Sequence, residues 1–464
     1  MTLIKSISGI RGTIGGKPGD NLTPLDVVKF ATSYGVWLKR RAQANKPKVI
    51  IGRDARISGP MVKQLIGSTL MGLGIDVVDI DLATTPTTEM AVTNLKANGG
   101  IIITASHNPK QWNALKLLNE KGEFLNGEDG EMILGIAENE SLLNEITYAD
   151  VDELGKLSTD TDQLEKHIDE ILALPYVDVR SIKEAKLTIA IDCVNSVGGI
   201  AIPALLKRLG VNDIIELFTE PNGYFPHNPE PLPENLGAIS EAVLKSSAHL
   251  GFVVDPDVDR LAIVNEDGSM FGEEYTLVAV ADYLLKYKPG NTVSNLSSSR
   301  ALRDVTLATG NNYYASAVGE VNVVEMMKSQ NASIGGEGNG GIILPDLHYG
   351  RDALVGIALF LTHYVKSGLK CSELRATYPE YFISKNKIEL SPELDVDLIL
   401  ENVKTKYSEE KVSTVDGVKI DFPDCWVHLR KSNTEPIIRI YSEAKSMAEA
   451  NGIARQIIND IEQM

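Results

Sequence analysis

Short apolar segments of the strand type alternate with longer segments of the helix type along most of this 464-residue chain. Such alternation predicts an α/β fold built from repeated units, with ligand-binding loops at the carboxyl ends of the strands. The length alone predicts about three domains. The expected strands include 48–52, 76–80, 101–104 and 187–192, and the expected helices lie near 60–73, 199–210 and 235–248. The pattern starts again after Gly272.

From about residue 380 the alternation changes. A strand is expected at 383–390, a helix near 393–406, then two more strands and a closing helix at 446–463. This arrangement predicts a separate C-terminal α+β domain.

An acidic loop stands between two apolar segments of the middle of the chain. Asp255, Asp257 and Asp259 occupy alternate positions, and Arg260 follows them directly. Carboxylate oxygens are the ligands that a hard divalent cation such as Mg²⁺ prefers. An arginine beside them suits an anionic substrate, so the loop predicts a metal site next to a bound anion.

A Ca²⁺ loop of the EF-hand type is an alternative for this segment, because its carboxylates fit positions 1, 3 and 5 and Glu266 falls at position 12. Two features argue against it. Position 6 is Arg260, where that loop needs glycine, and the flanking segments 251–254 and 261–264 have the pattern of strands. A solvated acidic turn is the other alternative, but it gives no reason for two buried flanking strands.

A serine follows the apolar segment 100–103, within the sequence Thr-Ala-Ser106-His107-Asn-Pro. A hydrolase triad is not supported, because adjacent residues of an extended segment point to opposite sides and no Gly-x-Ser-x-Gly elbow surrounds Ser106. Phosphoryl transfer through a phosphoserine beside the metal is the better interpretation. Lys116 lies ten residues on, and a lysine near a metal and phosphates can have its pKa lowered enough for proton transfer. Alone, it would be interpreted as a surface lysine.

Two further segments have the composition of ligand-binding loops. Arg430 and Arg439 bracket hydroxyls and an amide, Ser432, Asn433 and Thr434, which together suit a phosphate that does not react; a polar turn between strands is the alternative. The segment 335–341 carries five glycines with Glu337 and Asn339, whose side chains can bind vicinal hydroxyls. We expect a strand, a turn and a strand there rather than a flexible linker. It matches no nucleotide-binding motif.

Composition restricts the class of protein. The formal net charge of −18 argues against nucleic acid and anionic membranes as partners, so a local group of basic residues must attract an anionic substrate. We expect that group to be Arg11, Lys116, Arg260, Arg351, Arg430 and Arg439. No apolar run reaches the ~18 residues of a membrane span. Three widely separated cysteines, without a CxxC pair, fit reduced thiols and a cytoplasmic location.

Taken in their order along the chain, the four motif segments resemble the α-D-phosphohexomutase superfamily across essentially the whole chain. The Ser106 segment is similar to the phosphoserine loop of that family, the Asp255–Asp259 segment to its Mg²⁺ loop, the Glu337 segment to its sugar-binding loop and the Arg430 segment to its phosphate-binding loop. Further matches are the segments 8–12, 52–59, 228–231 and 233–236.

The resemblance implies one Mg²⁺ held by Asp255, Asp257, Asp259 and the phosphate on Ser106. It places Arg11 and His107 at the active centre and makes Lys116 a candidate general acid/base. It implies substrate contacts from Arg260, Glu337, Asn339, Arg430, Ser432, Asn433, Thr434 and Arg439.

Three positions depart from the family pattern. Gly341 stands where histidine is common, Ala114 where glycine is usual and Lys431 where proline is frequent. The sugar loop and the segment 318–322 look like the branch of phosphoglucosamine mutases typified by archaeal sequences. The ligand contact that the resemblance would assign to this histidine is therefore not expected to be made in the same way here.

The resemblance therefore implies the interconversion of glucosamine 6-phosphate and glucosamine 1-phosphate, through a phosphoserine primed by a hexose bisphosphate. A phosphomannomutase/phosphoglucomutase is the alternative, and a non-catalytic sugar-phosphate-binding protein is a distant one. We expect a monomer or homodimer. The implied fold is three similar α/β domains and a C-terminal α+β domain around a central active-site cleft, with the domains at 1–155, 156–265, 266–375 and 376–464.

Overall fold

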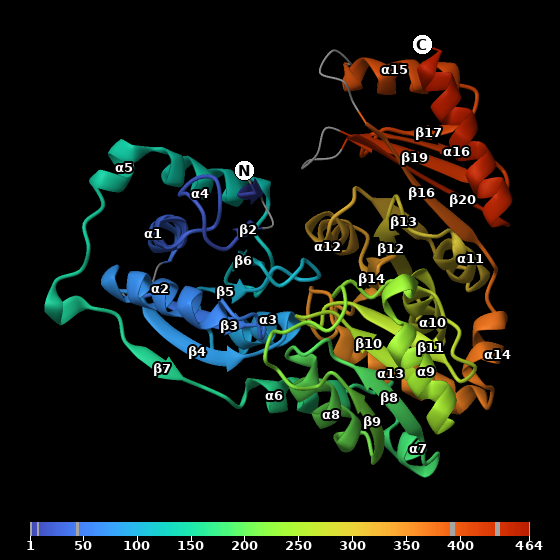
Figure 1. Ribbon diagram of the computed structural model, residues 1–464, viewed down its shortest axis with the longest axis horizontal. Coiled ribbons are helices and arrows are strands. Elements are labelled where there is room, and N and C mark those ends of the chain that lie inside the picture. The colour runs from blue at the N-terminus through green and yellow to red at the C-terminus, as the bar shows by residue number, and fades with distance from the viewer. Residues whose placement is uncertain (1, 7–8, 43–45, 390–394, 432–436, 464) are drawn as a thin grey trace. The chain divides into compact units, whose positions relative to one another are not determined.

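The computed structural model of the protein describes residues 2–6, 9–42, 46–389, 395–431 and 437–463. The chain folds into two compact units, and Figure 1 labels their helices and strands. The first unit contains Met1–Thr276 and Asn339–Glu373, and the second contains Leu277–Gly338 and Leu374–Met464.

A seven-stranded mixed sheet forms the N-terminal part of the first unit, with the strand order β1-β2-β6-β5-β3-β4-β7. Strands β5, β3, β4 and β7 are parallel, whereas β1, β2 and β6 pair antiparallel. The strands are β1 (Ile4–Ser6), β2 (Gly9–Thr13), β3 (Lys48–Arg53), β4 (Asp76–Leu82), β5 (Gly99–Ile103), β6 (Trp112–Leu118) and β7 (Leu157–Thr159). The helices of this part are α1 (Pro24–Arg41), α2 (Gly59–Gly72), α3 (Thr85–Asn94), α4 (Gly127–Glu138) and α5 (Glu140–Asn144).

Both faces of this sheet are covered, which explains the continuous apolar strands. Val49 and Ile51 pack with residues of α1, α2 and α4, while Ile50 between them packs with residues of α3 on the opposite face. Side chains alternate between the two faces of a strand, so an uninterrupted apolar run is required here. The first helix, α1, begins with a capping box, in which Thr23 and Asp26 bond each other's backbone N–H and Pro24 occupies the first helical turn.

The rest of the first unit contains a four-stranded sheet of order β11-β10-β8-β9. Helix α9 packs on Val253, whereas Phe360 of α13 makes an edge-to-face contact with Phe252 on the other face. The elements are α6 (Gln163–Leu172), α7 (Val179–Glu184), β8 (Thr188–Asp192), α8 (Gly198–Arg208), β9 (Asp213–Leu217), α9 (Gly237–Ser246), β10 (Leu250–Val254), β11 (Leu261–Asn265), β15 (Gly341–Ile343) and α13 (Ala353–Ser367). Two 3₁₀ turns lie at Val151–Glu153 and Pro233–Asn235.

The second unit contains the parallel strands β13, β12 and β14, with β12 in the middle. Its elements are β12 (Asn291–Asn295), α11 (Ala301–Ala308), β13 (Tyr313–Ser316), α12 (Glu320–Ser329) and β14 (Ala332–Glu337). Helices α10 (Glu273–Leu285) and α14 (Cys371–Ala376) lie where the chain passes between the units. The predicted strand, turn and strand around 335–341 are present as β14 and β15.

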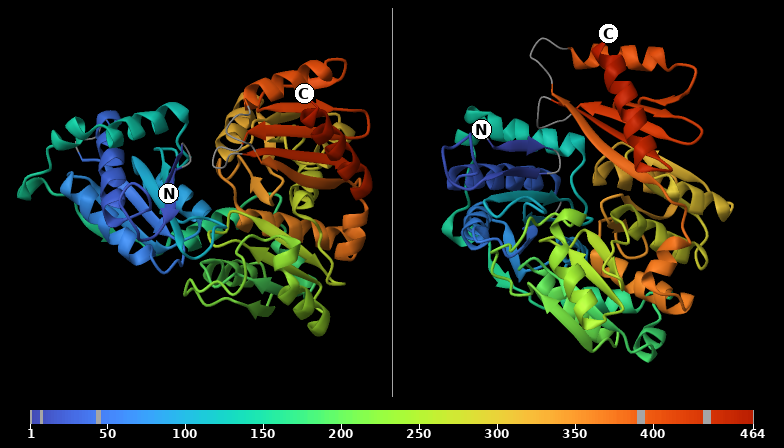
Figure 2. Two further views of the ribbon diagram at one scale, coloured as in Figure 1. Left: turned by 45° about the horizontal axis from the view of Figure 1, so that its top comes forward. Right: turned by 45° about the vertical axis from the view of Figure 1, so that its right-hand side comes forward.

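The C-terminal part of the second unit is an antiparallel sheet of order β16-β20-β19-β18-β17, with α15 and α16 together on one face (Figure 2). Its elements are β16 (Phe382–Glu389), α15 (Val396–Lys406), β17 (Lys411–Ser413), β18 (Val418–Asp421), β19 (Trp426–Lys431), β20 (Ile437–Ala444) and α16 (Met447–Glu462). The expectation of three strands is wrong: β17 and β18 are short and rich in lysine, aspartate and serine, so they lack an apolar run.

The predicted fold class is confirmed, since three parts of the chain combine parallel strands with helices and the fourth is an antiparallel α+β domain. Within the described ranges, no helix combines the length and the apolar character needed to cross a membrane. The predicted domain boundaries and the central cleft remain predictions.

Candidate active site

The acidic loop is the connection of the hairpin β10–β11, whose last pair before the loop is Val254 opposite Leu261. Asp255, Asp257 and Asp259 are fully buried, and their ligand oxygens all lie within 4.8 Å of one another. Asp255 Oδ1 accepts hydrogen bonds from the backbone N–H groups of Asp259 and Arg260, both at 3.2 Å. The loop backbone therefore wraps around the Asp255 carboxylate, and the carboxylates of Asp257 and Asp259 lie close to it.

These carboxylates fit a hard divalent cation. Within the described part of the chain, Asp257 Oδ1 and Asp259 Oδ1 are buried and accept no hydrogen bond. Burial, together with the charges of Asp259 and Asp257, raises the pKa of Asp255 well above its usual value. A bound cation would give the buried Asp257 and Asp259 oxygens a partner and would stabilise the negative charge of Asp255.

The EF-hand alternative fails on the flanks of the loop. They are the strands β10 and β11, as the sequence predicted, rather than helices. Glu266, which would be the last ligand of such a loop, accepts hydrogen bonds from the backbone N–H of Ser372 at 3.0 Å and from its hydroxyl at 2.5 Å. Its carboxylate is therefore engaged at the start of α14.

Ser106 reaches this loop from a different sheet. Its Oγ donates a hydrogen bond to Asp255 Oδ2 at 2.8 Å, and the serine is 8% exposed. Its backbone is left-handed, with φ of 48°. The segment is thus a turn, and the expectation that Ser106 and His107 point to opposite sides is wrong: Ser106 Oγ lies 3.3 Å from His107 Nδ1.

Lys116 lies on β6, where it pairs with Ile102 of β5 and its ammonium reaches the acidic loop. Its Nζ donates to Asp257 Oδ2 at 2.7 Å and lies 3.5 Å from Asp259 Oδ2. Burial alone would lower the pKa of Lys116, but the charges of Asp257 and Asp259 outweigh burial and raise it. In these surroundings the side chain is a charged ammonium, and the lowered pKa expected beside a metal ion and phosphates stays a prediction.

Two more groups bond the oxygens that Lys116 contacts. The Thr85 hydroxyl at the start of α3 donates to Asp257 Oδ2 at 2.6 Å. Arg351 Nη2 donates to Asp259 Oδ2 at 2.7 Å. Together with Lys116, these donors compensate two of the three buried carboxylates.

Four of the six predicted basic residues, Arg11, Lys116, Arg260 and Arg351, gather in the first unit. Burial and the nearby charges of Arg260, Arg351 and Arg11 lower the pKa of His107 to about 2, so its imidazole is neutral. Burial and the charge of Arg260 also lower the pKa of Arg11. Glu230 Oε1 lies 3.3 Å from Arg260 Nη1 and offsets part of this positive charge.

The second unit holds Glu337, at the end of β14. Its Oε1 accepts from Asn295 Nδ2 at 2.9 Å and from the backbone N–H of Gly319 at 3.2 Å. The neighbouring Val318 N–H donates to Asp416 Oδ2 at 3.0 Å, and Arg430 Nη1 lies 3.5 Å from the same oxygen. The turn at 318–319 thus links the predicted sugar-binding glutamate to the predicted phosphate-binding arginine.

The remaining predicted ligand residues are placed as follows. Arg439 pairs directly with Arg430 across β19 and β20. Asn339 belongs to the first unit, where its side-chain oxygen accepts from the Gly341 N–H at 3.2 Å. Ser432, Asn433 and Thr434 lie outside the described residues.

Similarity to known proteins covers nearly the whole chain. Four domains of the phosphoglucomutase/phosphomannomutase family match it: alpha/beta/alpha domains I, II and III at residues 3–144, 165–268 and 272–381, and the C-terminal domain at 390–460. A phosphoglucomutase/phosphomannomutase of Thermococcus kodakarensis is 36% identical over 445 residues, which span 95% of either chain. The chain belongs to this family.

It is therefore a phosphohexomutase of the α-D-phosphohexomutase superfamily, an intramolecular phosphotransferase. A probable phosphoglucosamine mutase of Methanopyrus kandleri is 32% identical over 456 residues, covering 97% of this chain and 96% of the relative. A phosphoglucomutase/phosphomannomutase family protein of Burkholderia thailandensis has the same fold, with a TM-score of 0.83 at 24% identity over 99% of this chain and 98% of that one.

The phosphohexomutase also contains a buried support for the Ser106 loop that sequence reasoning missed. Arg56 Nε bonds Asp54 Oδ2 at 2.9 Å, and both side chains are fully buried. The other guanidinium nitrogens donate to the backbone carbonyls of Ser106, Asn108, Pro109 and Trp112. Asp54 Oδ2 further accepts from Thr104 Oγ1 at 2.7 Å. The sequence could have indicated this support. Segment 52–59 begins at the end of β3, and β3 pairs in parallel with β5, the strand that leads to Ser106.

We expect Arg56→Met to destabilise the phosphohexomutase by about 3–5 kcal/mol, because it leaves the Asp54 carboxylate buried and unpaired. The matched control is Arg53→Met. Arg53 pairs with Asp81, whose side chain is 45% exposed, so that loss should stay below about 1 kcal/mol. Urea unfolding of both variants measures the difference, and equal midpoints would contradict the supporting role of Arg56.

Close packing against Arg351 explains why residue 341 of this phosphohexomutase is a glycine. A Cβ at Gly341 would lie 2.3 Å from Arg351 Cδ, so a side chain there would occupy the space of the arginine that bonds Asp259. Gly340 has a similar constraint, because a Cβ there would lie 2.2 Å from the Leu261 carbonyl of the β10–β11 hairpin.

Gly341→His should therefore destabilise the protein by about 1–3 kcal/mol through overpacking. The cost should shrink when Arg351→Ala is present, which a double-mutant cycle of unfolding free energies measures. Gly67→Ala is the control, since a Cβ at Gly67 meets no atom within 4 Å. Additive effects of the two changes would show that position 341 and Arg351 do not compete for space.

Proposed function

We propose that this phosphohexomutase interconverts glucosamine 6-phosphate and glucosamine 1-phosphate through a phosphoserine at Ser106 and a bisphosphorylated sugar. The observation that carries the proposal is the hydrogen bond of 2.8 Å between Ser106 Oγ and Asp255. It brings a serine hydroxyl to the edge of a buried carboxylate cluster that fits Mg²⁺.

Asp255, Asp257 and Asp259, with a phosphate oxygen on Ser106, would hold the ion. When bound, Mg²⁺ polarises the phosphate oxygens and offsets charge that develops during transfer. A family neighbour, the N-acetylphosphoglucosamine mutase of Aspergillus fumigatus, is known in complex with GlcNAc-6P and magnesium. Its TM-score to this chain is 0.53 at 15% identity, over 91% of this chain and 84% of that one.

In the proposed transfer, the bond between phosphorus and Ser106 Oγ breaks as a bond forms between phosphorus and the free sugar hydroxyl. The hydroxyl loses its proton, and Ser106 Oγ regains one when it leaves. His107 Nδ1 lies 3.3 Å from Ser106 Oγ, close enough for a hydrogen bond to that oxygen, but its lowered pKa makes it a weak base. Lys116 is charged, which suits charge compensation, and its role as general acid/base requires that the bound metal ion lower its raised pKa. Arg11 and Arg260 bind the transferring phosphoryl group.

The reverse transfer requires the sugar phosphate to turn end for end. One set of groups must therefore hold the distal phosphate in both orientations, and another must hold hydroxyls common to both. We assign the first task to Arg430, Ser432, Asn433, Thr434 and Arg439 and the second to Glu337 and Asn339. The contacts through Val318 and Gly319 support joint action of Glu337 and Arg430.

Glucosamine is the proposed hexose because relatives from Methanopyrus kandleri and Pyrococcus horikoshii, both at 32% identity, are named probable phosphoglucosamine mutases, and one from Sulfurisphaera tokodaii at 30% identity is named a phosphoglucosamine/phosphogalactosamine mutase. Glucose and mannose phosphates are the second candidate, because the Thermococcus kodakarensis relative at 36% identity is named phosphoglucomutase/phosphomannomutase.

Parallel assays on the phosphorylated enzyme with glucosamine, glucose and mannose phosphates test the substrate. We expect the highest kcat/KM for the glucosamine pair, because the sugar-binding loop would favour the substituent at C2 of its own substrate. A higher kcat/KM for glucose or mannose phosphate would replace glucosamine with the second candidate and leave the mutase reaction intact.

Ser106→Ala should lower turnover by several orders of magnitude without loss of the fold, because it removes the atom that carries the phosphoryl group. A coupled assay and circular dichroism measure the two effects. Ser33→Ala serves as the control, since the Ser33 hydroxyl bonds the Lys29 carbonyl one turn earlier in α1. Substantial turnover by Ser106→Ala would exclude the phosphoserine route.

Asp257→Asn should weaken Mg²⁺ binding by at least ~10-fold, because it removes one charge from a three-carboxylate set. Asp81→Asn is the control, since it removes the same charge from a carboxylate that pairs with Arg53 and Lys63 and belongs to β4 instead of the acidic loop. The Mg²⁺ concentration at half-maximal activity measures both. An unchanged value for Asp257→Asn would rule out this loop as the ion site.

A further inference from the structure

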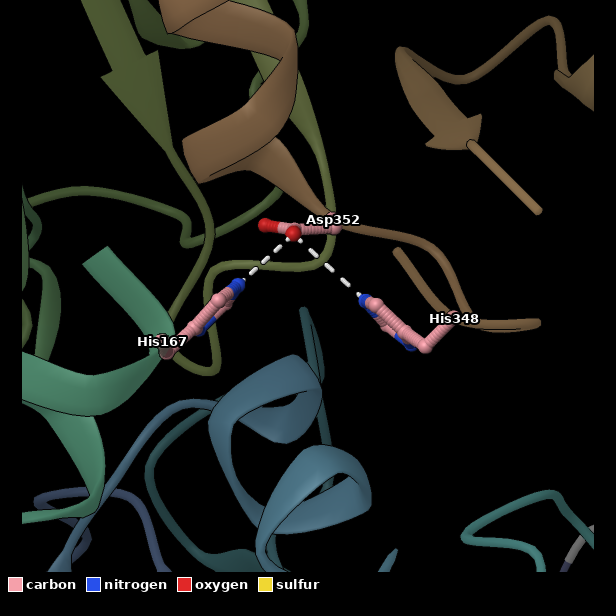
Figure 3. Close-up of side chains that lie close together, drawn as sticks. All are labelled: His167, His348 and Asp352. Carbon is pink, nitrogen blue, oxygen red and sulfur yellow. Dashed lines mark hydrogen bonds and ion pairs between the residues drawn. The ribbon is translucent and has the colours of Figure 1, made fainter. Parts of the chain in front are cut away.

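A second cluster of ligand side chains lies in the first unit, outside the proposed Mg²⁺ loop. It consists of His167 of α6, His348, and Asp352, which caps the N-terminus of α13 (Figure 3). His167 and Asp352 are fully buried and His348 is 11% exposed. The two imidazoles point toward the carboxylate from different sides, and both bring Nε2 to the same oxygen.

The spacing of these atoms suits one metal ion. His167 Nε2 lies 2.9 Å and His348 Nε2 lies 3.4 Å from Asp352 Oδ2, and all the ligand atoms lie within 4.8 Å of one another. In a tetrahedral zinc site with bonds of about 2.0–2.1 Å, neighbouring ligand atoms are about 3.3 Å apart. The two nitrogen–oxygen distances therefore lie within a few tenths of an ångström of those in such a site.

The opposite ring nitrogens lie close to polar groups of the kind that orient metal-binding histidines. His167 Nδ1 lies 3.0 Å from Thr87 Oγ1, and His348 Nδ1 lies 3.2 Å from the Glu89 carboxylate. Such partners fix the ring orientation and make Nε2 a better ligand. Asp352 is held as well, because its Oδ1 accepts from the backbone N–H groups of Leu354 and Val355 at 2.8 and 3.3 Å.

A metal-free ion-pair network is the competing explanation. Burial alone would lower the pKa of His348, but hydrogen bonds to Asp352 and Glu89 outweigh burial and raise it to about 10. In that state both Nε2–H groups donate to one carboxylate oxygen. Metal binding would release these protons, while the contacts of both Nδ1 atoms persist.

We propose that His167 Nε2, His348 Nε2 and Asp352 bind a borderline divalent cation of the Zn²⁺ class, separately from the Mg²⁺ of the Asp255–Asp259 loop. Imidazole nitrogen favours zinc over Mg²⁺, whereas an all-oxygen set favours Mg²⁺. The two sites differ in donor chemistry, so one protein can hold both ions. The proposal is independent of the hexose assigned above.

The position of the cluster indicates a structural role. The cluster joins α6 to the start of α13 and, through Thr87 and Glu89, to α3. The same two helix starts contact the Mg²⁺ loop: Thr85 Oγ1 donates to Asp257 at 2.6 Å, and the Ala353 N–H donates to the Val258 carbonyl at 3.2 Å. A zinc ion would therefore hold the elements that lie directly behind the catalytic carboxylates.

Metal analysis of the full-length protein tests this inference. After chelator treatment, the protein is saturated with Mg²⁺, titrated with Zn²⁺ and passed through gel filtration. We expect one zinc per chain in the wild type and in Asp257→Asn, and at least a 10-fold weaker affinity in His167→Gln and His348→Gln. Zinc should raise the thermal midpoint of the wild type by a few degrees. Circular dichroism shows whether each variant is folded.

Co²⁺ gives a readout that needs no variant to fold, because Co²⁺ in a tetrahedral site with nitrogen ligands has far more intense visible absorption bands than Co²⁺ in an octahedral all-oxygen site. Those bands in Mg²⁺-saturated wild-type protein support the proposal. It is overturned if no zinc survives gel filtration, if His348→Gln keeps full affinity, or if zinc is lost only in Asp257→Asn, which would place it in the Mg²⁺ loop.

Discussion

Three carboxylates buried within a six-residue hairpin loop are the constraint on which the rest of the first unit depends. Negative charges that lie so close together and out of water are strongly unfavourable unless cations and donors compensate them. The surrounding contacts provide this compensation: Lys116 and Thr85 bond Asp257, Arg351 bonds Asp259, and Ser106 bonds Asp255. A bound metal ion would complete this compensation, and in the proposed mechanism it would contact a phosphate on Ser106.

The α/β architecture brings these groups together. Strand β5 ends next to β3, so Ser106 and the Asp54–Arg56 pair follow neighbouring parallel strands at one edge of a sheet. Lys116 comes from the antiparallel neighbour β6. The acidic loop is supplied by a separate sheet, and the segment 339–353 returns to it with Gly340 and Arg351. Small residues matter here because Gly340 and Gly341 leave room for the hairpin backbone and for the arginine.

Local sequence patterns predicted the fold class, the acidic hairpin and the serine after β5, because each depends on an apolar run and the residues directly after it. What they missed depends on contacts between distant segments. The upward pKa shift of Lys116 requires knowing that its partners are Asp257 and Asp259. The contact of Ser106 with His107 requires the left-handed turn at the serine. His167 and Asp352 are 185 positions apart, so no local pattern could join them.

The central claim is that Ser106 carries the phosphoryl group between the two ends of the sugar. Incubation with a hexose bisphosphate bearing isotope-labelled phosphate, followed by peptide mapping, tests it most directly. We expect the label on the peptide that contains Ser106, and a chase with unlabelled glucosamine 6-phosphate should move it into the bisphosphorylated sugar within one turnover. Label that is absent from this peptide, or that stays there during steady turnover, would contradict the account.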